Sequence, residues 1–122
     1  INRLNFLIKK KINEAKIGNI KVRGNYSIIS GDLFAFCQNV FGIKTEQLGL
    51  LKAGEVYHKY WIDRNVNEVA CFRPPMCCHN NIRVAKVVHN DEIDFWYQYI
   101  KTALVLNCHD TICMAESGAD KD

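Results

Sequence analysis

The stretch that decides the fold is residues 68–88, which read EVACFRPPMCCHNNIRVAKVV. Both ends of this stretch are rich in β-branched and apolar residues, a composition that predicts a strand at each end. Between the two strands, Pro74 and Pro75 lack the amide proton that a sheet needs, and they force the chain to leave the sheet. The sequence therefore predicts two strands joined by a stiffened loop.

This loop gathers residue types that bind phosphates and sugars. Arg73 ends the first strand, His79 and Asn80 lie in the loop, and Arg83 belongs to the second strand. Guanidinium, imidazole and carboxamide groups supply hydrogen-bond donors for phosphate oxygens and sugar hydroxyls. The loop is therefore a candidate binding site, and a proline-rigid surface loop without a ligand is the alternative.

Toward the N-terminus, residues 2–17 carry apolar side chains at helical spacing with lysines on the other side, which predicts an amphipathic helix. Asn2 is expected to cap its start, and Gly18 is expected to end it. The rest of the chain alternates short apolar runs with turn signals. In the first half of the chain, these runs predict strands on both sides of Gly24-Asn25, a helix capped by Asp32 that ends near Gly42, and a strand after a turn at Ala53-Gly54. A polar turn is expected at residues 63–67. In the second half, the runs predict a helix over residues 91–100 capped by Asp91, a buried strand over residues 102–107 and a short helix from Thr111.

Many short strands with a few helices predict an α+β fold that is mainly β, a small barrel with helical excursions. The length of 122 residues fits one domain, and a hydrophobic content of 48% is enough to bury a core. We therefore expect a basic amphipathic helix over residues 1–17 that leads into a barrel over residues 18–122. No stretch approaches the roughly 18 apolar residues of a membrane span, and the polar N-terminus does not resemble a secretory signal.

Residues 1–23 are strongly basic, with one acidic residue against seven basic ones: Arg3, Lys9, Lys10, Lys11, Lys16, Lys21 and Arg23. Such a patch suits a phosphate backbone, although a solvated helix face has the same composition. Lys21 and Arg23 follow the predicted helix and are candidate nucleic-acid-binding residues.

The six cysteines are expected to be reduced thiols in a cytosolic protein, because a chain with its own core does not need disulfides. A zinc-stabilised module is an alternative, with Cys77, Cys78, His79, Cys108, His109 and Cys113 as candidate ligands. The sequence has no C-x₂-C or H-x₃-H spacing to support that alternative. It also has no Gly-rich phosphate loop, nucleophile elbow or Ser/His/Asp signature.

The sequence ends in the acidic segment SGADKD, residues 117–122. Asp120 and Asp122 stand two residues apart after a glycine, so a tight loop can turn both carboxylates onto one hard cation. Mg²⁺ takes oxygen ligands, and without a metal the two carboxylates would repel each other. The segment therefore predicts a magnesium site, and a solvated acidic terminus is the alternative.

Four segments, taken in order, resemble motifs of one family. Residues 21–27, KVRGNYS, resemble the K-G-R-x-x-Y-S-G-R segment in the β′ subunit of cellular RNA polymerases. Residues 49–57, GLLKAGEVY, resemble the G-x-L-x-x-G-x-V segment of the RNA-silencing RNA-dependent RNA polymerases. Residues 73–83 resemble their R-N-P-x-x-H-P-G-D-I-R motif. Residues 117–122 resemble the start of their S-G-G-D-x-D-G-D metal loop, which is N-A-D-F-D-G-D in β′.

The resemblance covers roughly residues 19–122 and indicates the two-barrel RNA polymerases, in which two double-psi β-barrels face the active centre. The chain resembles the barrel that carries the aspartates, so the implied fold is a double-psi β-barrel. Divergence from both cellular types suggests a single-chain bacteriophage polymerase. Because the family's third aspartate would lie two residues past Asp122, we expect the sequence to be a fragment of that polymerase.

Carried over by position, the resemblance implies that Asp120 and Asp122 bind the catalytic Mg²⁺ and that Arg73 reaches the nucleotide. It implies that His79 shapes the loop and that Asn80 contacts the substrate. Asn80 and the residue after it replace the family's Pro-Gly-Asp or Arg, so the sequence departs from the family at that contact. Lys21, Arg23 and Arg83 would line the nucleic-acid channel.

The implied activity is Mg²⁺-dependent nucleotidyl transfer that joins ribonucleoside triphosphates into RNA. The expected partners are the nucleoside triphosphates, the template nucleic acid, the RNA product, and the second barrel and remainder of the same polymerase chain, without a membrane. The expected location is the cytoplasm of a bacterial host cell or the virion, without secretion by a signal of its own. The isolated chain is expected to be inactive, and a non-enzymatic nucleic-acid-binding barrel is the alternative function.

Overall fold

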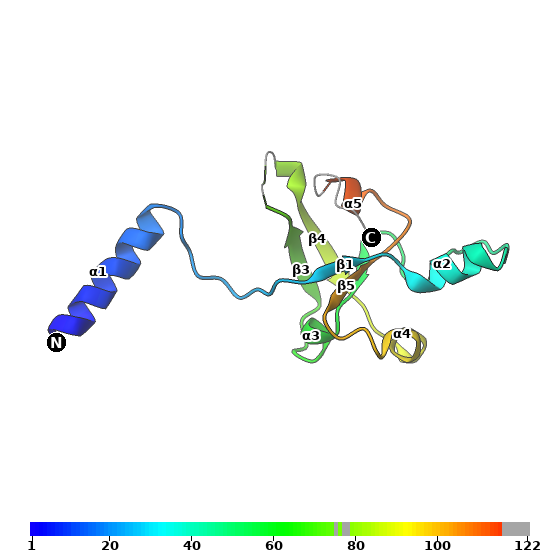
Figure 1. The fold of residues 1–122 in the computed structure, drawn as a ribbon, viewed down its shortest axis with the longest axis horizontal. Coiled ribbons are helices and arrows are strands. Elements are labelled where there is room, and N and C mark those ends of the chain that lie inside the picture. The colour runs from blue at the N-terminus through cyan, green and yellow to red at the C-terminus, as the bar shows by residue number, and fades with distance from the viewer. Residues whose placement is uncertain (75, 77–78, 116–122) are drawn as a thin grey trace.

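The computed structural model describes residues 1–74, 76 and 79–115 of the chain. In this part the fold is α+β, as expected, and its five strands form one curled, mixed sheet (Figure 1). The helices are α1 (Asn2–Lys16), α2 (Leu33–Val40), α3 (Lys59–Ile62), α4 (Asp91–Tyr97) and α5 (Ile112–Ala115), with a 3₁₀ turn, η1, at His79–Asn81. The strands are β1 (Ile28–Ser30), β2 (Glu55–Tyr57), β3 (Glu68–Phe72), β4 (Ile82–Val87) and β5 (Ala103–Leu106). The helices cover more of the described residues than the strands do, contrary to the expectation of a mainly β fold, because α1 alone spans 15 residues.

The strand order in the sheet is β1-β5-β2-β4-β3, so β1 and β3 are its two edges. β5 is parallel to β1 and antiparallel to β2, whereas β4 is parallel to β2 and antiparallel to β3. Only β3 and β4 are neighbours both in the sequence and in the sheet. They are the two strands predicted from residues 68–88, and Phe72 lies opposite Ile82 where the pair meets the loop.

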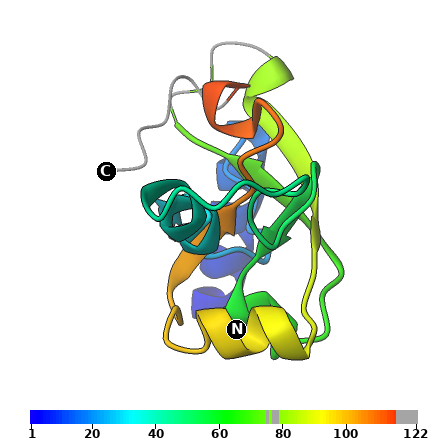
Figure 2. The same cartoon turned by 90° about the vertical axis from the view of Figure 1, so that its right-hand side faces the viewer.

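The core lies on both faces of the sheet, because side chains alternate along β2 and β5 and each strand serves two clusters. One cluster joins β2, β4 and β5 to α5 and consists of Val56, Ala85, Val87, Leu104, Leu106 and Ile112. The other joins β2 and β5 to α4 and consists of Leu51, Tyr57, Ile93, Tyr97 and Val105. Figure 2 shows α4 and α5 at the two ends of the sheet. Burial on both faces explains why β5 is apolar throughout and does not alternate.

The structure differs from the sequence prediction between α1 and β1. Residues 19–27 form no strand, so the hairpin expected around Gly24-Asn25 is absent and only β1 is present. Ile20 and Val22 are each 71% exposed, and no strand of the described sheet pairs with them. β-branched residues favour strands only where a neighbouring strand and a buried face are at hand.

The helix ends were predicted with mixed success. α3 was not expected, and it begins where the buried His58 side chain caps it. The structure uses Asn90 to cap α4 in place of the predicted Asp91, and Asn2 lies inside α1 without capping it. The helix predicted after Asp32 is confirmed, because Asp32 accepts hydrogen bonds from the first-turn amides of α2.

α1 stands apart from the sheet in Figure 1, joined to it by extended residues 18–27, and none of its residues is buried. Gly18 ends the helix as predicted, with a φ of +91°. The amides of Gly18 and Asn19 donate to the carbonyls of Ala15 and Glu14 at 3.0 and 2.8 Å, a closure that needs a left-handed residue at Gly18. Among the described residues, no helix, α1 included, is long and apolar enough to cross a membrane.

Candidate functional site

The predicted binding loop lies at one end of the β3–β4 hairpin. In the register of the hairpin, Cys71 pairs with Arg83 and Phe72 pairs with Ile82. Arg73 therefore leaves the sheet at the same end at which η1 leads into β4. Arg73, His79 and Arg83 are all exposed, and Asn80 lies within η1. The structure therefore brings the four candidate residues of the loop to one end of the sheet.

This end of the hairpin is tied to α5. The carboxamide of Asn81, which is 5% exposed, donates a hydrogen bond of 2.7 Å to the carbonyl of Ala115, the last residue of α5. α5 also packs against β4, and Figures 1 and 2 both show it beside the end of the hairpin. The end of the loop is thus fixed to Ala115, two residues before the acidic segment 117–122 begins.

A polar turn at residues 107–110 supports the start of α5. Asp110 accepts hydrogen bonds from the Asn107 carboxamide at 2.8 Å and from the backbone amides of Gly54 at 2.7 Å and Ile112 at 2.9 Å. Burial alone would raise the pKa of Asp110, but these hydrogen bonds and the positive charge of Arg83 outweigh it and hold the pKa below its usual value. Asp110 is therefore an ionised anchor for α5, with both oxygens occupied by donors.

Asp120 and Asp122, the predicted magnesium ligands, lie outside the described residues, as do the Cys77 and Cys78 of the zinc alternative. Asp120 comes five residues after Ala115, and even a fully extended chain spans at most about 18 Å over that length. Within residues 1–74, 76 and 79–115, no three His, Cys, Asp or Glu side chains gather as they would around a metal ion.

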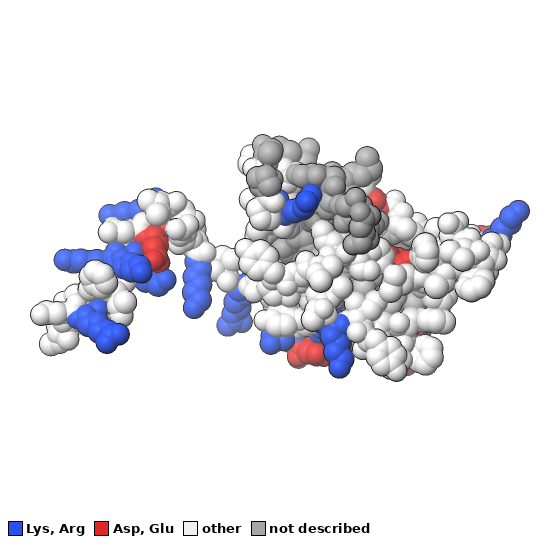
Figure 3. Space-filling model, viewed as in Figure 1, with Lys and Arg blue, Asp and Glu red and all other residues white. Residues whose placement is uncertain are grey.

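The two basic residues predicted to contact nucleic acid lie elsewhere. Lys21 and Arg23 are exposed on the extended segment between α1 and β1, not at the hairpin end with Arg73 and Arg83. Figure 3 shows Lys and Arg side chains spread over α1 and along this segment. The chain therefore carries two separate basic surfaces: a basic arm over residues 1–23, and a basic hairpin end with Arg73 and Arg83.

Sequence reasoning missed a buried polar cluster at the start of α3. The ring of His58 is 1% exposed, its Nδ1 accepts the backbone amide of Tyr60 at 3.2 Å, and its Nε2 lies 2.6 Å from the hydroxyl of Ser27. Since Nδ1 is an acceptor, the ring proton sits on Nε2 and is donated to Ser27. The ring therefore cannot take the proton of Ser27, and the pair lacks the arrangement of a Ser–His nucleophile.

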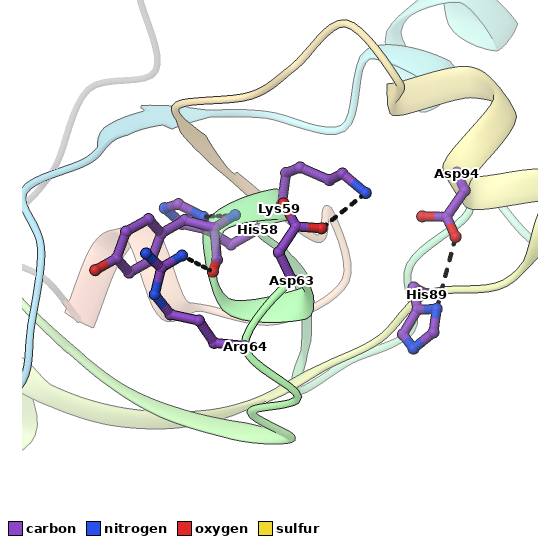
Figure 4. A network of polar contacts seen from close by, with 7 residues as sticks. His58, Lys59, Asp63, Arg64, His89 and Asp94 are labelled. Atoms are coloured by element: carbon purple, nitrogen blue, oxygen red, sulfur yellow. Dashed lines mark hydrogen bonds and ion pairs between the residues drawn. The ribbon is translucent and has the colours of Figure 1, made fainter.

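Burial also lowers the pKa of His58, which keeps the ring neutral. Figure 4 shows the polar contacts around α3, where Lys59 pairs with Asp63 at 3.0 Å and Arg64 lies over the Tyr60 ring. These are local contacts that hold α3. No signal in the sequence could have joined Ser27 to a histidine 31 residues away.

A second buried group, Asp32, was predicted only as a helix cap. Its Oδ1 accepts the first-turn amides of α2 and the hydroxyl of Tyr97, and its Oδ2 accepts the amide of Leu50 at 2.9 Å. Desolvation and the bond to Asp32 raise the pKa of Tyr97 far above its usual range. Asp32 therefore joins α2, α4 and the turn before β2, and all its contacts serve the fold.

Comparison of the chain with models of protein families, with curated proteins and with solved structures gives no match.

Proposed function

We propose that the chain is the catalytic-barrel part of a single-chain bacteriophage RNA polymerase of the two-barrel type. The observation that supports this best is the hydrogen bond from Asn81 to the carbonyl of Ala115. In the resemblance, the loop that starts at Arg73 and the acidic segment that contains Asp120 serve one active centre. The bond joins the end of the first segment to the helix that precedes the second, although the two motifs are far apart in the sequence.

The finer fold of this proposal is a double-psi β-barrel. The curled, mixed sheet supports it, because β1 pairs in parallel with β5 and β2 pairs in parallel with β4 although neither pair is consecutive. Such crossovers between short strands are typical of small closed barrels and not of meanders. The second barrel and the remainder of the polymerase chain are the proposed partners, in the cytoplasm of a bacterial host or packaged in the virion.

The donor chemistry of the acidic segment fits magnesium. Asp120 and Asp122 both offer carboxylate oxygens, which Mg²⁺ prefers, and we propose that they hold it. Mg²⁺ bound there would lower the pKa of the 3′-hydroxyl of the RNA and neutralise charge on the phosphates.

The other proposed roles belong to side chains of the loop and the basic segments. Arg73 orients the nucleoside triphosphate through hydrogen bonds from its guanidinium to the ribose hydroxyls. His79 holds the shape of the loop, and Asn80 contacts the same substrate. Lys21, Arg23 and Arg83 contact the phosphates of template and product, as exposed cations do.

The test uses the complete polymerase with a matched pair of carboxylate changes. We expect Asp120→Asn to lower RNA synthesis by at least about a thousandfold, because metal-ion stabilisation supplies several kcal/mol and about 1.4 kcal/mol is a factor of ten. Asp63→Asn is the control, since the exposed Asp63 pairs only with Lys59 among the described contacts. Near-normal elongation by Asp120→Asn would sink the metal assignment.

The substrate role of Arg73 has a separate test in the same enzyme. Arg73→Lys keeps the positive charge but loses the planar fork of donors. We expect a higher KM for ribonucleotides and weaker discrimination against deoxyribonucleotides, measured by competitive incorporation. Discrimination equal to that of the wild type would show that Arg73 does not read the ribose.

A second candidate function, a non-enzymatic nucleic-acid-binding barrel, is favoured by one observation. All seven basic residues of residues 1–23 are exposed, so the arm is free to contact phosphates. This function predicts salt-dependent binding of RNA or DNA by the chain itself, measured by fluorescence anisotropy. Changing Lys9, Lys10 and Lys11 to Ala should flatten the salt dependence, whereas changing Lys44, Lys52 and Lys101 should not. No binding at low salt would exclude it.

A further inference from the structure

α1 exposes an apolar stripe that its own chain leaves uncovered. Leu4, Leu7, Ile8 and Ile12 lie along one face of the helix and are 47–62% exposed, and Lys11 lies on the same face. Phe6, on the opposite face, is 66% exposed. An isolated helix of 15 residues is marginal in water, and most helical stability comes from packing of an apolar face. α1 therefore requires a partner for this stripe.

An apolar surface is exposed where α2 meets α4, with a pocket of about 70 Å³ between the two helices; we call this surface the α2–α4 groove. The groove is lined by Leu33, Phe34, Cys37, Trp96 and Tyr97. The rings of Phe34 on α2 and Trp96 on α4 meet edge to face, with their centroids 4.9 Å apart. Leu33 and Trp96 are about half exposed. Rigid apolar walls of this kind accept the apolar face of a helix.

The charges of the two surfaces are complementary. α1 carries five basic residues and one acidic residue, whereas α2 carries no charged residue and α4 carries three acidic residues in its first turn and no basic one. Glu92 precedes Trp96 by one helical turn, so its carboxylate lies on the side of α4 that borders the groove. Basic residues beside the apolar stripe of α1 would therefore meet acidic residues beside the groove.

We propose that α1 docks in the α2–α4 groove of a second copy of this chain. In Figure 1, α1 and α2 lie at opposite ends of the molecule, separated by the extended residues 18–27 and the sheet. In this arrangement α1 reaches the groove of a neighbouring copy and not its own. Exchange of the two helices gives two identical interfaces and closes a two-fold dimer. This inference does not depend on the proposed function.

A native thiol permits a direct test, because Cys37 is exposed, free and part of the groove. Cysteines placed in the stripe, one variant each at Leu4, Ile8 and Ile12, are treated with a short bismaleimide. We expect covalent dimers from at least one of them, and none from Phe6→Cys or from the same variants that also carry Cys37→Ser. Peptide mapping should find the link between α1 of one chain and Cys37 of the other.

Light scattering on the uncrosslinked chain gives the second readout. We expect twice the mass of a single chain, and Ile8→Asp should weaken the dimer at least tenfold while Phe6→Asp leaves it unchanged. Monomeric mass with intramolecular links to Cys37 would show that α1 occupies its own groove and would overturn the proposal. A monomer without any link, including one whose α1 binds anionic vesicles instead, would overturn it as well.

Discussion

At the scale of single residues, the buried carboxylate of Asp32 organises one side of the molecule. It is 5% exposed, and five donors from three parts of the chain converge on it: the amides of Phe34, Ala35, Leu50 and Leu51 and the hydroxyl of Tyr97. A buried charge is tolerated only when its lone pairs are occupied in this way. The chain must therefore approach Asp32 closely, which it does at Gly49.

Gly49 and Gly54 form a matched pair for measuring that close approach. Both have a φ of +79°, but a Cβ at Gly49 would collide with the carboxylate of Asp32, whereas a Cβ at Gly54 would meet no atom within 4 Å. We expect Gly54→Ala to cost about 1 kcal/mol for its left-handed backbone. Gly49→Ala should cost at least about 2 kcal/mol more because buried groups must move. Equal urea midpoints for the two variants would contradict this account.

His58 predicts a dependence of stability on pH. Burial depresses its pKa below the ordinary value of 6.5, so below that pH the unfolded chain takes up a proton that the folded chain refuses. The free energy of unfolding should therefore fall as the pH drops below 6.5, by at most about 1.4 kcal/mol per pH unit. The fall should end at the depressed pKa of the folded chain. Above that range the group contributes no pH dependence.

The measurement compares urea unfolding at pH about 7.5 and about 5.5. His58→Gln should abolish the part of the slope that comes from this window, and His89→Gln, which removes an exposed imidazole, should retain it. A wild-type slope in His58→Gln would assign the pH dependence to another group.

At this scale, what the sequence predicts is local. Asp32 as a cap could be read directly, because a cap bonds amides two and three residues away. Its contacts with Tyr97 and Leu50 could not, since they depend on how distant elements pack. The same holds for the candidate site. Arg73 and His79 were found by residue type and by resemblance, but the bond that holds their loop beside α5 joins Asn81 to a residue 34 positions away.

At the scale of elements, the cap at Asp32 and the helix ends at Gly18 and near Gly42 were predicted because each signal lies within a few residues, whereas the caps expected at Asn2 and Asp91 were wrong. Gly42, with a φ of +65°, ends α2 as Gly18 ends α1. The pairing of strands was not predictable in this way, because the order β1-β5-β2-β4-β3 joins segments far apart in the sequence. α3 was missed because a helix of four residues leaves almost no periodicity to detect.

α5 is the element whose stability depends on the hairpin end. Asn81→Ala removes the carboxamide that donates to Ala115 and leaves a carbonyl of α5 without that partner. We expect amide hydrogen exchange in α5 to accelerate about tenfold, in keeping with the loss of one buried hydrogen bond. Asn39→Ala, an exposed change in α2, is the control. Unchanged protection in α5 would show that the hairpin does not hold this helix.

At the scale of the whole molecule, the chain combines a sheet with two buried faces and a helix with none. The sheet residues Val56, Val105 and Leu106 are fully buried, while every residue of α1 is at least partly exposed. The two parts therefore have different sources of stability. The sheet holds itself together, and α1 depends on what it docks against.

Amide hydrogen exchange should separate these two levels. In the Ile8→Asp variant, which removes α1 from its groove, we expect the amides of α1 to exchange almost as fast as in an unstructured peptide. The amides of β2 and β5 should keep their rates within about a factor of two, since α1 buries nothing in the sheet. Phe6→Asp should resemble the wild type throughout. Faster exchange in β5 of the Ile8→Asp variant would show that α1 belongs to the same cooperative unit.

The position of β5 between β1 and β2 has a consequence for the order of events on the ribosome. β5 begins at Ala103, so this interior strand is the last of the five described strands to be synthesised, although its neighbours end at Ser30 and Tyr57. At ordinary elongation rates β2 waits about 2 to 10 seconds for this strand. During that interval the nascent chain holds β1 and β2 without the strand that joins them, so this part of the sheet cannot form until β5 has been synthesised.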